Sequence, residues 1–348
     1  MTKFISAKEA AGLIADGATV AASGFCGFAS PDALFQGIRE RFEDSGRPRS
    51  LTIVKGVSNG DRGARGISRI AAEGLVHKII SSHVGLEPAM AKLITDNQVF
   101  AYMLPFGTVI DIVNAAACHK PGVITKVGLG TFADPRVEGS KVNARTKESG
   151  EDIVTLMEID GEACLFYRPL PVDVALIRAT YADEDGNLSM DKEAISADQL
   201  ELAKAAHNTG GIVIAQVERI VAKSSLNPRN VRVHGFMVDY VVEASPEYHL
   251  QGFDCESYRP ELTGEIRVPL SSLDPLPLDN RKICGRRAAM ELKAGMLVNL
   301  GIGMPDAVAA VAGEEGISDK FTLSIESGTL GGVPLGGLGL GAGVNPEA

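Results

Sequence analysis

The stretch GATVAASGFCGFASPDALFQGI at residues 17–38 decides the fold, because it passes from an apolar segment through a glycine turn into a helix. A second stretch, AGMLVNLGIGMPDAVAAVAG at 294–313, has the same order. Pro-Asp-Ala opens both helices, with proline in the first turn and aspartate beside the positive end of the helix. A second apolar segment follows each helix, LTIVKG at 51–56 and FTLSIESG at 321–328. These repeats predict a β-α-β unit used twice.

Composition points to an α/β protein. The chain has 348 residues, 39 glycines, no tryptophan and 5% aromatic residues, which favours many tight strand-to-helix turns over a β-sandwich. It is 45% hydrophobic and 22% charged, as is ordinary for globular proteins. We therefore expect an α/β fold of two related open domains, the second of them incomplete.

Charge and cysteine usage limit the partners and the compartment. A formal charge of -10 without long basic runs argues against nucleic acid. The five cysteines are scattered and form no CxxC pair, and the six histidines show no metal spacing, so we expect neither disulfides nor a metal, and a cytoplasmic location. No segment approaches the roughly 20 apolar residues of a membrane span, so no membrane association is expected.

The remaining pattern predicts the domain division. Strand-like segments alternate with helical ones, including a helix expected over 67–79 (ISRIAAEGLVHKI). We expect a first domain at 1–265, a linker rich in proline and leucine at 266–282, and a second domain at 283–348. Because no capped helix or closing strand is expected in the glycine-rich tail, we infer that the chain is cut short or is completed by another polypeptide.

Chemistry-bearing residues cluster at the predicted strand ends. Glu326 follows an alternating strand and precedes a glycine turn, so it is either an attacking carboxylate at the ligand-binding edge or a solvated strand-end residue. The glycine turns offer backbone amides that suit an oxyanion or a carboxylate. Neither turn is a dinucleotide fingerprint. Cys26 in the first turn is either a nucleophile or a buried small residue. A basic cluster faces either an acidic cofactor, or solvent, or another subunit: Arg281, Lys282, Arg286 and Arg287.

Many ordered motifs resemble those of the family I coenzyme A transferases, most of all the propionate (acetate, lactate) CoA-transferases. Besides both glycine turns, they include KPGVITKVGLGTFADPR, ALIRATYADEDGNLSMD, AAHNTGGIVIAQV, VRVHGFMVDYVV, KICGRRAAMEL and LSIESGTLGGVP. The resemblance implies that Glu326 is the nucleophile and that the reaction passes through a glutamyl-CoA thioester. It also implies acyl-CoA and short-chain carboxylic acids as substrates, no cofactor besides CoA as substrate, and a homo-oligomer.

The resemblance further implies substrate-binding and oxyanion positions. In the second turn these are Gly301, Ile302 and Gly303; elsewhere they are Gly24, Phe25, Gly27, Phe106 and Gly107. Relatives commonly have a Gln-Gly pair where this chain has Phe106 and Gly107, so we expect a changed acid preference or a more apolar acyl group. An acyl-CoA hydrolase on the same fold and an inactive truncated fragment or assembly subunit remain the alternatives.

Overall fold

The computed structural model describes residues 2–252, 258–269, 274–301, 303–325, 327–336, 339 and 341–348. Its contacts divide the chain into two compact units, which are Met1–Asp191 with Ser196–His249, and Lys192–Ile195 with Leu250–Ala348. The sequence-based domain boundaries at 265 and 282 stay predictions.

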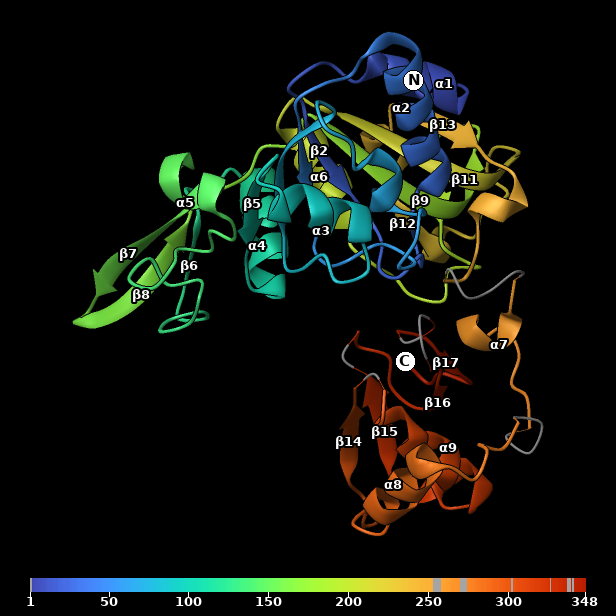
Figure 1. The fold of residues 1–348 in the computed structure, drawn as a ribbon. Helices are drawn as coiled ribbons and strands as arrows, with labels where there is room; N and C mark the ends of the chain where they lie inside the picture. Colours follow the sequence, from blue (N-terminus) through green and yellow to red (C-terminus); the bar gives the residue numbers. More distant parts are fainter. Residues whose placement is uncertain are drawn as a thin grey trace. The chain divides into compact units, whose positions relative to one another are not determined.

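A mostly parallel ten-stranded sheet forms the centre of the first unit (Figure 1). In spatial order its main path is β1 (Lys3–Phe4), β13 (Tyr240–Glu243), β11 (Ile212–Val221), β9 (Val174–Asp183), β2 (Thr19–Ala22), β3 (Leu51–Val54), β4 (Val76–Ser81) and β5 (Phe100–Met103). Neighbours on this path are all parallel. Two short antiparallel strands join beside β9, namely β10 (Leu188–Ser189) and β12 (Val231–Val233).

Helices cover both faces of this sheet and enclose two apolar cores. The helices α1 (Ala7–Leu13), α2 (Asp32–Ser45) and α3 (Pro88–Thr95) pack on one face, and α4 (Phe106–Ala117) and α6 (Gln199–Asn208) on the other. Successive strand residues alternate between the two cores. Val20 lies in the core under α1, α2 and α3, and Ala21 lies in the core under α4 and α6. Burial on both faces explains the nearly continuous apolar strands, and the predicted α/β class is confirmed.

The helix expected over 67–79 is wrong. A 3-10 helix, η1 (Ile67–Ile70), is followed by a turn at Gly74, whose φ of 82° favours glycine, and the rest enters β4. Pairing of β4 with β3 and β5 overrides the local helical pattern.

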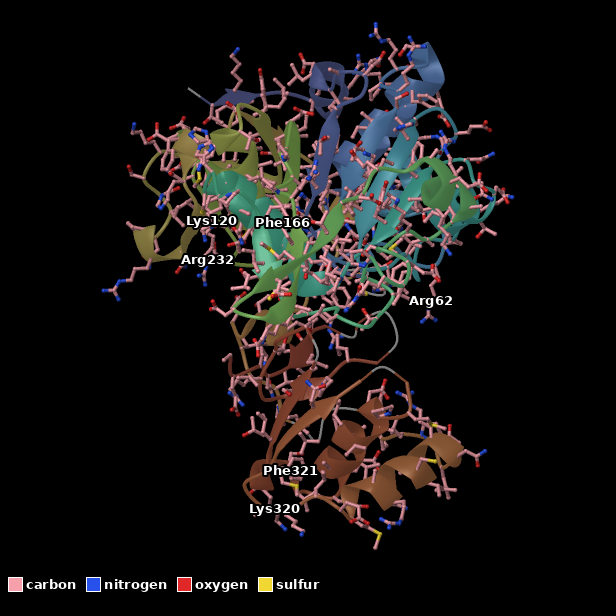
Figure 2. The ribbon with its side chains drawn as sticks, turned by 90° about the vertical axis from the view of Figure 1, so that its left-hand side faces the viewer. Arg62, Lys120, Phe166, Arg232, Lys320 and Phe321 are labelled. Carbon is pink, nitrogen blue, oxygen red and sulfur yellow. The ribbon has the colours of Figure 1, made fainter. Side chains whose placement is uncertain are left out.

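A separate antiparallel sheet contains one strand that the sequence predicts, within VITKVGL at 123–129, and two strands that it does not. It consists of β6 (Val123–Thr125), β8 (Glu162–Tyr167) and β7 (Val154–Ile159), and the short helix α5 (Ala144–Ser149) precedes β7 (Figure 1). Phe166 on β8 is labelled in Figure 2. The remaining single-turn helices of the first unit are η2 (Pro228–Asn230), η3 (Gly235–Met237) and η4 (Pro246–Tyr248).

The second unit repeats the first β-α-β layout. Its elements are α7 (Pro260–Thr263), α8 (Asn280–Ala289), β14 (Leu297–Leu300), α9 (Asp306–Glu314), η6 (Ser318–Lys320), β15 (Thr322–Ile325), β16 (Val333–Pro334) and β17 (Gly343–Val344). Strands β14 and β15 are parallel neighbours, as β2 and β3 are, so the predicted duplication is confirmed. The absence of a closing strand in the tail was a wrong expectation, because β16 and β17 pair antiparallel.

Candidate functional site

The strand order places a switch point between β2 and β9. From β2 the chain continues sideways through β3, β4 and β5, whereas from β9 it continues the opposite way through β11 and β13. Ligands of open α/β sheets bind outside the carboxyl ends of the strands at such a point. The first glycine turn directly follows β2, so it lies at the expected ligand edge.

This first glycine turn, residues 23–30, is tightly packed. Gly24 has a φ of 117°, and a Cβ there would lie 2.8 Å from Nδ2 of Asn59 and 2.9 Å from the carbonyl oxygen of Phe28. Gly27 has a φ of 87°. The Phe25 amide donates to Phe28 O at 3.0 Å, and the Gly27 amide donates to Oδ1 of Asn59 at 3.3 Å. These two amides are engaged within the protein, so the predicted oxyanion role of this turn stays a prediction.

Below the turn, Arg178 of β9 is 1% exposed and holds two carbonyl groups of the turn. Its Nη1 donates to Gly27 O at 3.2 Å and to Ser30 O at 3.4 Å. On the neighbouring strand β11, the buried Gln216 lies opposite Arg178, and its Oε1 accepts the Ala33 amide at the start of α2. Buried polar groups therefore hold the tip and the exit of the turn and the start of α2, as buried polar groups must find partners.

Asp198, which precedes α6, adds an unusual carboxyl group at this edge. Its Oδ1 is enclosed and has no hydrogen-bond partner among the described residues. Burial raises the pKa of Asp198 to about 7, and a hydrogen bond from the Gly24 amide opposes that shift. Sequence reasoning missed this residue, since aspartate before a helix ordinarily signals only an N-cap.

A buried ion pair lies at the ends of β3 and β4. Lys55 and Glu87 are 1% and 0% exposed in their side chains, and Nζ lies 2.9 Å from Oε1. Nζ also donates to Ser81 Oγ at 2.9 Å and to His83 O at 3.0 Å. Burial lowers the pKa of Lys55, and the Glu87 carboxylate opposes the shift. Nothing in the sequence spacing indicated this pair.

Phe106 and Gly107 open α4 at the same edge, directly after β5 and Pro105. The Phe106 ring is 50% exposed and lies against Gly56, where a Cβ would stand 2.7 Å from the ring. Gly107 has open space around its Cα. An exposed aromatic ring therefore sits beside the end of β3, and its predicted substrate role stays a prediction.

The second glycine turn differs from the first in its packing. A Cβ added at Gly301 or Gly303 would meet no atom within 4 Å. Among the described residues, no hydrogen bond is donated by either amide. Gly303 has a φ of 96°, so glycine is required there for backbone conformation and not for space. This turn leaves amide donors and room for a ligand. Ile302 lies outside the described residues.

Glu326, the predicted nucleophile, also lies outside the described residues. Ile325 ends β15 and is buried, and its amide donates to Thr329 O at 3.1 Å. Ser327 Oγ donates to Gly341 O at 2.9 Å, and Gly328 has a φ of 104°. The residues on both sides of position 326 are thus held by defined hydrogen bonds. Leu300 lies opposite Ile325 in the register of β14 and β15. The second turn follows Leu300 in the sequence and Glu326 follows Ile325, so both come directly after a pair of neighbouring strand residues.

The basic cluster of α8 pairs with acidic groups of its own unit. Lys282 contacts Glu314 at 2.6 Å and Arg286 contacts Glu315 at 3.3 Å. Arg287 pairs with Glu291, two residues beyond the end of α8, and Arg281 pairs with Asp306 at the start of α9. The first copy also has an arginine paired with the aspartate at the start of its helix, since Arg69 Nη2 lies 2.8 Å from Oδ2 of Asp32.

A cavity of about 530 Å³ in the second unit is lined in part by the amino end of β15. Lys320 and Phe321, labelled in Figure 2, line it. Within the described part of the chain, no His, Cys, Asp or Glu residues gather as a metal site. No helix in that same part has both the length and the apolar character to cross a membrane.

Comparison with known proteins identifies the family. The Coenzyme A transferase family model matches residues 4–244. A caffeate CoA-transferase of Acetobacterium woodii is 43% identical over 348 residues, which is 100% of this chain and 66% of that protein. The acetate CoA-transferase YdiF of Escherichia coli K12 is 38% identical, over 99% of this chain and 64% of its own length.

A crystal structure of acyl-CoA transferase YdiF from E. coli O157:H7, in a thioester complex with CoA, matches with a TM-score of 0.89 and 36% identity. The match covers 100% of this chain and 64% of the YdiF chain. The chain therefore spans about two thirds of the length of these relatives. On the extent of the family match, the chain belongs to the coenzyme A transferase family.

Proposed function

We propose that the protein moves CoA between a short-chain acyl-CoA, such as propionyl-CoA or acetyl-CoA, and a carboxylic acid, with Glu326 as the covalent nucleophile. The carrying observation is the open second turn, whose Gly301 and Gly303 amides have no partner among the described residues and follow the strand paired with β15. Family membership and the likeness to the YdiF thioester complex support the same reaction.

The proposed chemistry has two reversible halves. The Glu326 carboxylate attacks the acyl carbonyl and expels CoA as a thiolate, which leaves a mixed anhydride. The thiolate then attacks the glutamyl carbonyl and forms a glutamyl-CoA thioester, while the original acid departs as a carboxylate. A second carboxylate repeats these steps in reverse, so the kinetics are ping-pong.

Each tetrahedral intermediate carries an oxyanion that amide donors must stabilise, and losing one such donor typically costs about 2.7 to 4 kcal/mol of transition-state stabilisation. The proposed donors belong to the turn of Gly301, Ile302 and Gly303. At the edge of the first unit, the exposed ring of Phe106 supports a preference for a more apolar acyl group.

A direct test is to trap the covalent intermediate. After incubation with propionyl-CoA and an acid quench, the intact mass of the protein should rise by one CoA less one water. Glu326→Ala should show no such adduct and no transfer to acetate. Glu148→Gln is the matched control, because Glu148 is an exposed glutamate of α5. An adduct that persists in Glu326→Ala would refute the assignment. Release of free CoA without acid transfer would identify a hydrolase.

A homo-oligomer and a reducing, cytoplasmic compartment are proposed from the family resemblance and the scattered cysteines. CoA is proposed as a substrate, with no further cofactor. Light scattering combined with size-exclusion chromatography measures the oligomeric state.

A further inference from the structure

The first glycine turn holds an uncommon amount of left-handed backbone. Besides Gly24 and Gly27, two residues that carry side chains have positive φ, namely Cys26 at 49° and Ala29 at 51°. Side-chain-bearing residues avoid this region, so such a conformation persists only where surrounding contacts impose it. The turn is buried except at Phe25, which is half-buried. What holds this shape therefore also fixes the place of Phe25.

One side chain, that of Asn59, contacts the turn at three points. Nδ2 donates to Ser23 O at 3.1 Å and to Ser30 Oγ at 3.0 Å, and Oδ1 accepts the Gly27 amide at 3.3 Å. These residues are the entry, the tip and the exit of the turn. Asn59 is 1% exposed, so water does not compete for its three bonds.

Asn59 is itself held by the buried ion pair. Its amide donates to Oε1 of Glu87 at 2.6 Å, and the same oxygen pairs with Nζ of Lys55 at 2.9 Å. Ser58 Oγ also donates to this oxygen at 3.3 Å, and it accepts the Leu86 amide at 3.0 Å. A continuous hydrogen-bonded chain thus runs from Lys55 through Glu87 and Asn59 to the turn.

We propose that Asn59 is a positioning residue: it clamps the strained turn so that Phe25 stands at the switch point toward the acyl substrate, and the Lys55–Glu87 pair fixes Asn59. This inference rests on the proposed transferase function for its catalytic consequence. That Asn59 holds the first glycine turn concerns only the first unit, and this claim can be tested without enzyme turnover.

Two variants test the clamp. Asn59→Ala removes all three bonds. Asn59→Asp keeps the oxygen that accepts the Gly27 amide but sets a second oxygen against Ser23 O in a site that is 1% exposed, so its effect should be at least as large as that of alanine. Asn230→Ala is the control, because Asn230 is an exposed asparagine of the same unit.

The first readout is alkylation of Cys26, a buried thiol in the turn, by N-ethylmaleimide, located by peptide mass spectrometry. We expect the Cys26 rate to rise about tenfold or more in both Asn59→Ala and Asn59→Asp through local opening of the turn. Buried Cys164 reports loosening of the whole unit. Unchanged Cys26 labelling, or equal rises at Cys26 and Cys164, would overturn the positioning role.

The second readout separates binding from chemistry. Asn59→Ala should raise the KM for the acyl substrate about tenfold while the Glu326 thioester still forms at saturating propionyl-CoA. A fall in kcat with unchanged KM would contradict placement of Phe25 by Asn59. If wild type shows no transfer, the proposed function fails, and Cys26 labelling still decides whether Asn59 holds the turn.

Discussion

The Lys55–Glu87 pair allows a quantitative prediction. Lys55→Met keeps the length of the side chain but leaves the Glu87 carboxylate buried without its cation. The acceptors at Val57 O, Ser81 Oγ and His83 O also lose a donor. Removing one member of a buried pair typically costs about 3 to 5 kcal/mol. We expect a loss in this range in the free energy of unfolding of the first unit.

A double-mutant cycle isolates the charge. Glu87→Gln retains an oxygen for the Asn59 amide and removes the charge, so Lys55→Met combined with Glu87→Gln should cost about 2 kcal/mol less than the sum of the single changes. The control is Lys92→Met, because the exposed Lys92–Asp96 pair of α3 should contribute under about 0.5 kcal/mol.

The assay should report the first unit alone, since a chain with two compact units does not guarantee a single unfolding transition. Hydrogen exchange of peptides covering β2, β3 and β9 measures the opening free energy of their amides. A cost below about 1 kcal/mol for Lys55→Met, or simple additivity in the cycle, would show that the pair is not a coupled buried ion pair.

Three further outcomes are expected. Because burial raises the pKa of Asp198 to about 7 from an unfolded value near 3.9, its contribution to stability is fully present below the unfolded pKa and lost as pH rises through about 7. Asp198→Asn should therefore gain stability relative to wild type as pH rises from about 4 to about 7, by at most about 4 kcal/mol, in urea unfolding followed by a probe within the first unit. Gly24→Ala should cost more than about 3 kcal/mol through backbone overlap and strain, whereas Gly303→Ala should cost about 1 to 2 kcal/mol from φ alone; hydrogen exchange of each unit compares them. Arg281→Gln should speed exchange in α9, because the buried Asp306 loses its cation, and unchanged exchange would exclude that role.

The duplicated β-α-β unit could be predicted because its signals are local. Proline and aspartate at a helix start, and apolar residues before a glycine turn, act within a few residues. The helix expected over 67–79 failed for the opposite reason. Its periodicity is local, but Val76–Ser81 gains ladder hydrogen bonds from β3 and β5 that the sequence does not reveal.

The buried polar groups of the site could not be predicted. Lys55 and Glu87 are of residue types that usually stay in water, and 32 positions separate them. Asn59 sits in a glycine-rich loop where asparagine ordinarily signals only a turn. Their partners come from strands that become neighbours only after the sheet forms, so no spacing rule connects them.

The two copies of the repeat differ in a way that favours placing the proposed chemistry in the second copy. Ala21 lies opposite Val54 and Leu300 lies opposite Ile325, and by sequence the next residues after β3 and β15 are Lys55 and Glu326. In the first copy that position is occupied by an ion pair, and the adjoining turn is closed by Asn59. In the second copy the adjoining turn keeps open space at Gly303. Because a carboxylate nucleophile requires free amide donors and access for the acyl carbonyl, the open turn of the second copy favours the proposed placement of the nucleophile after β15.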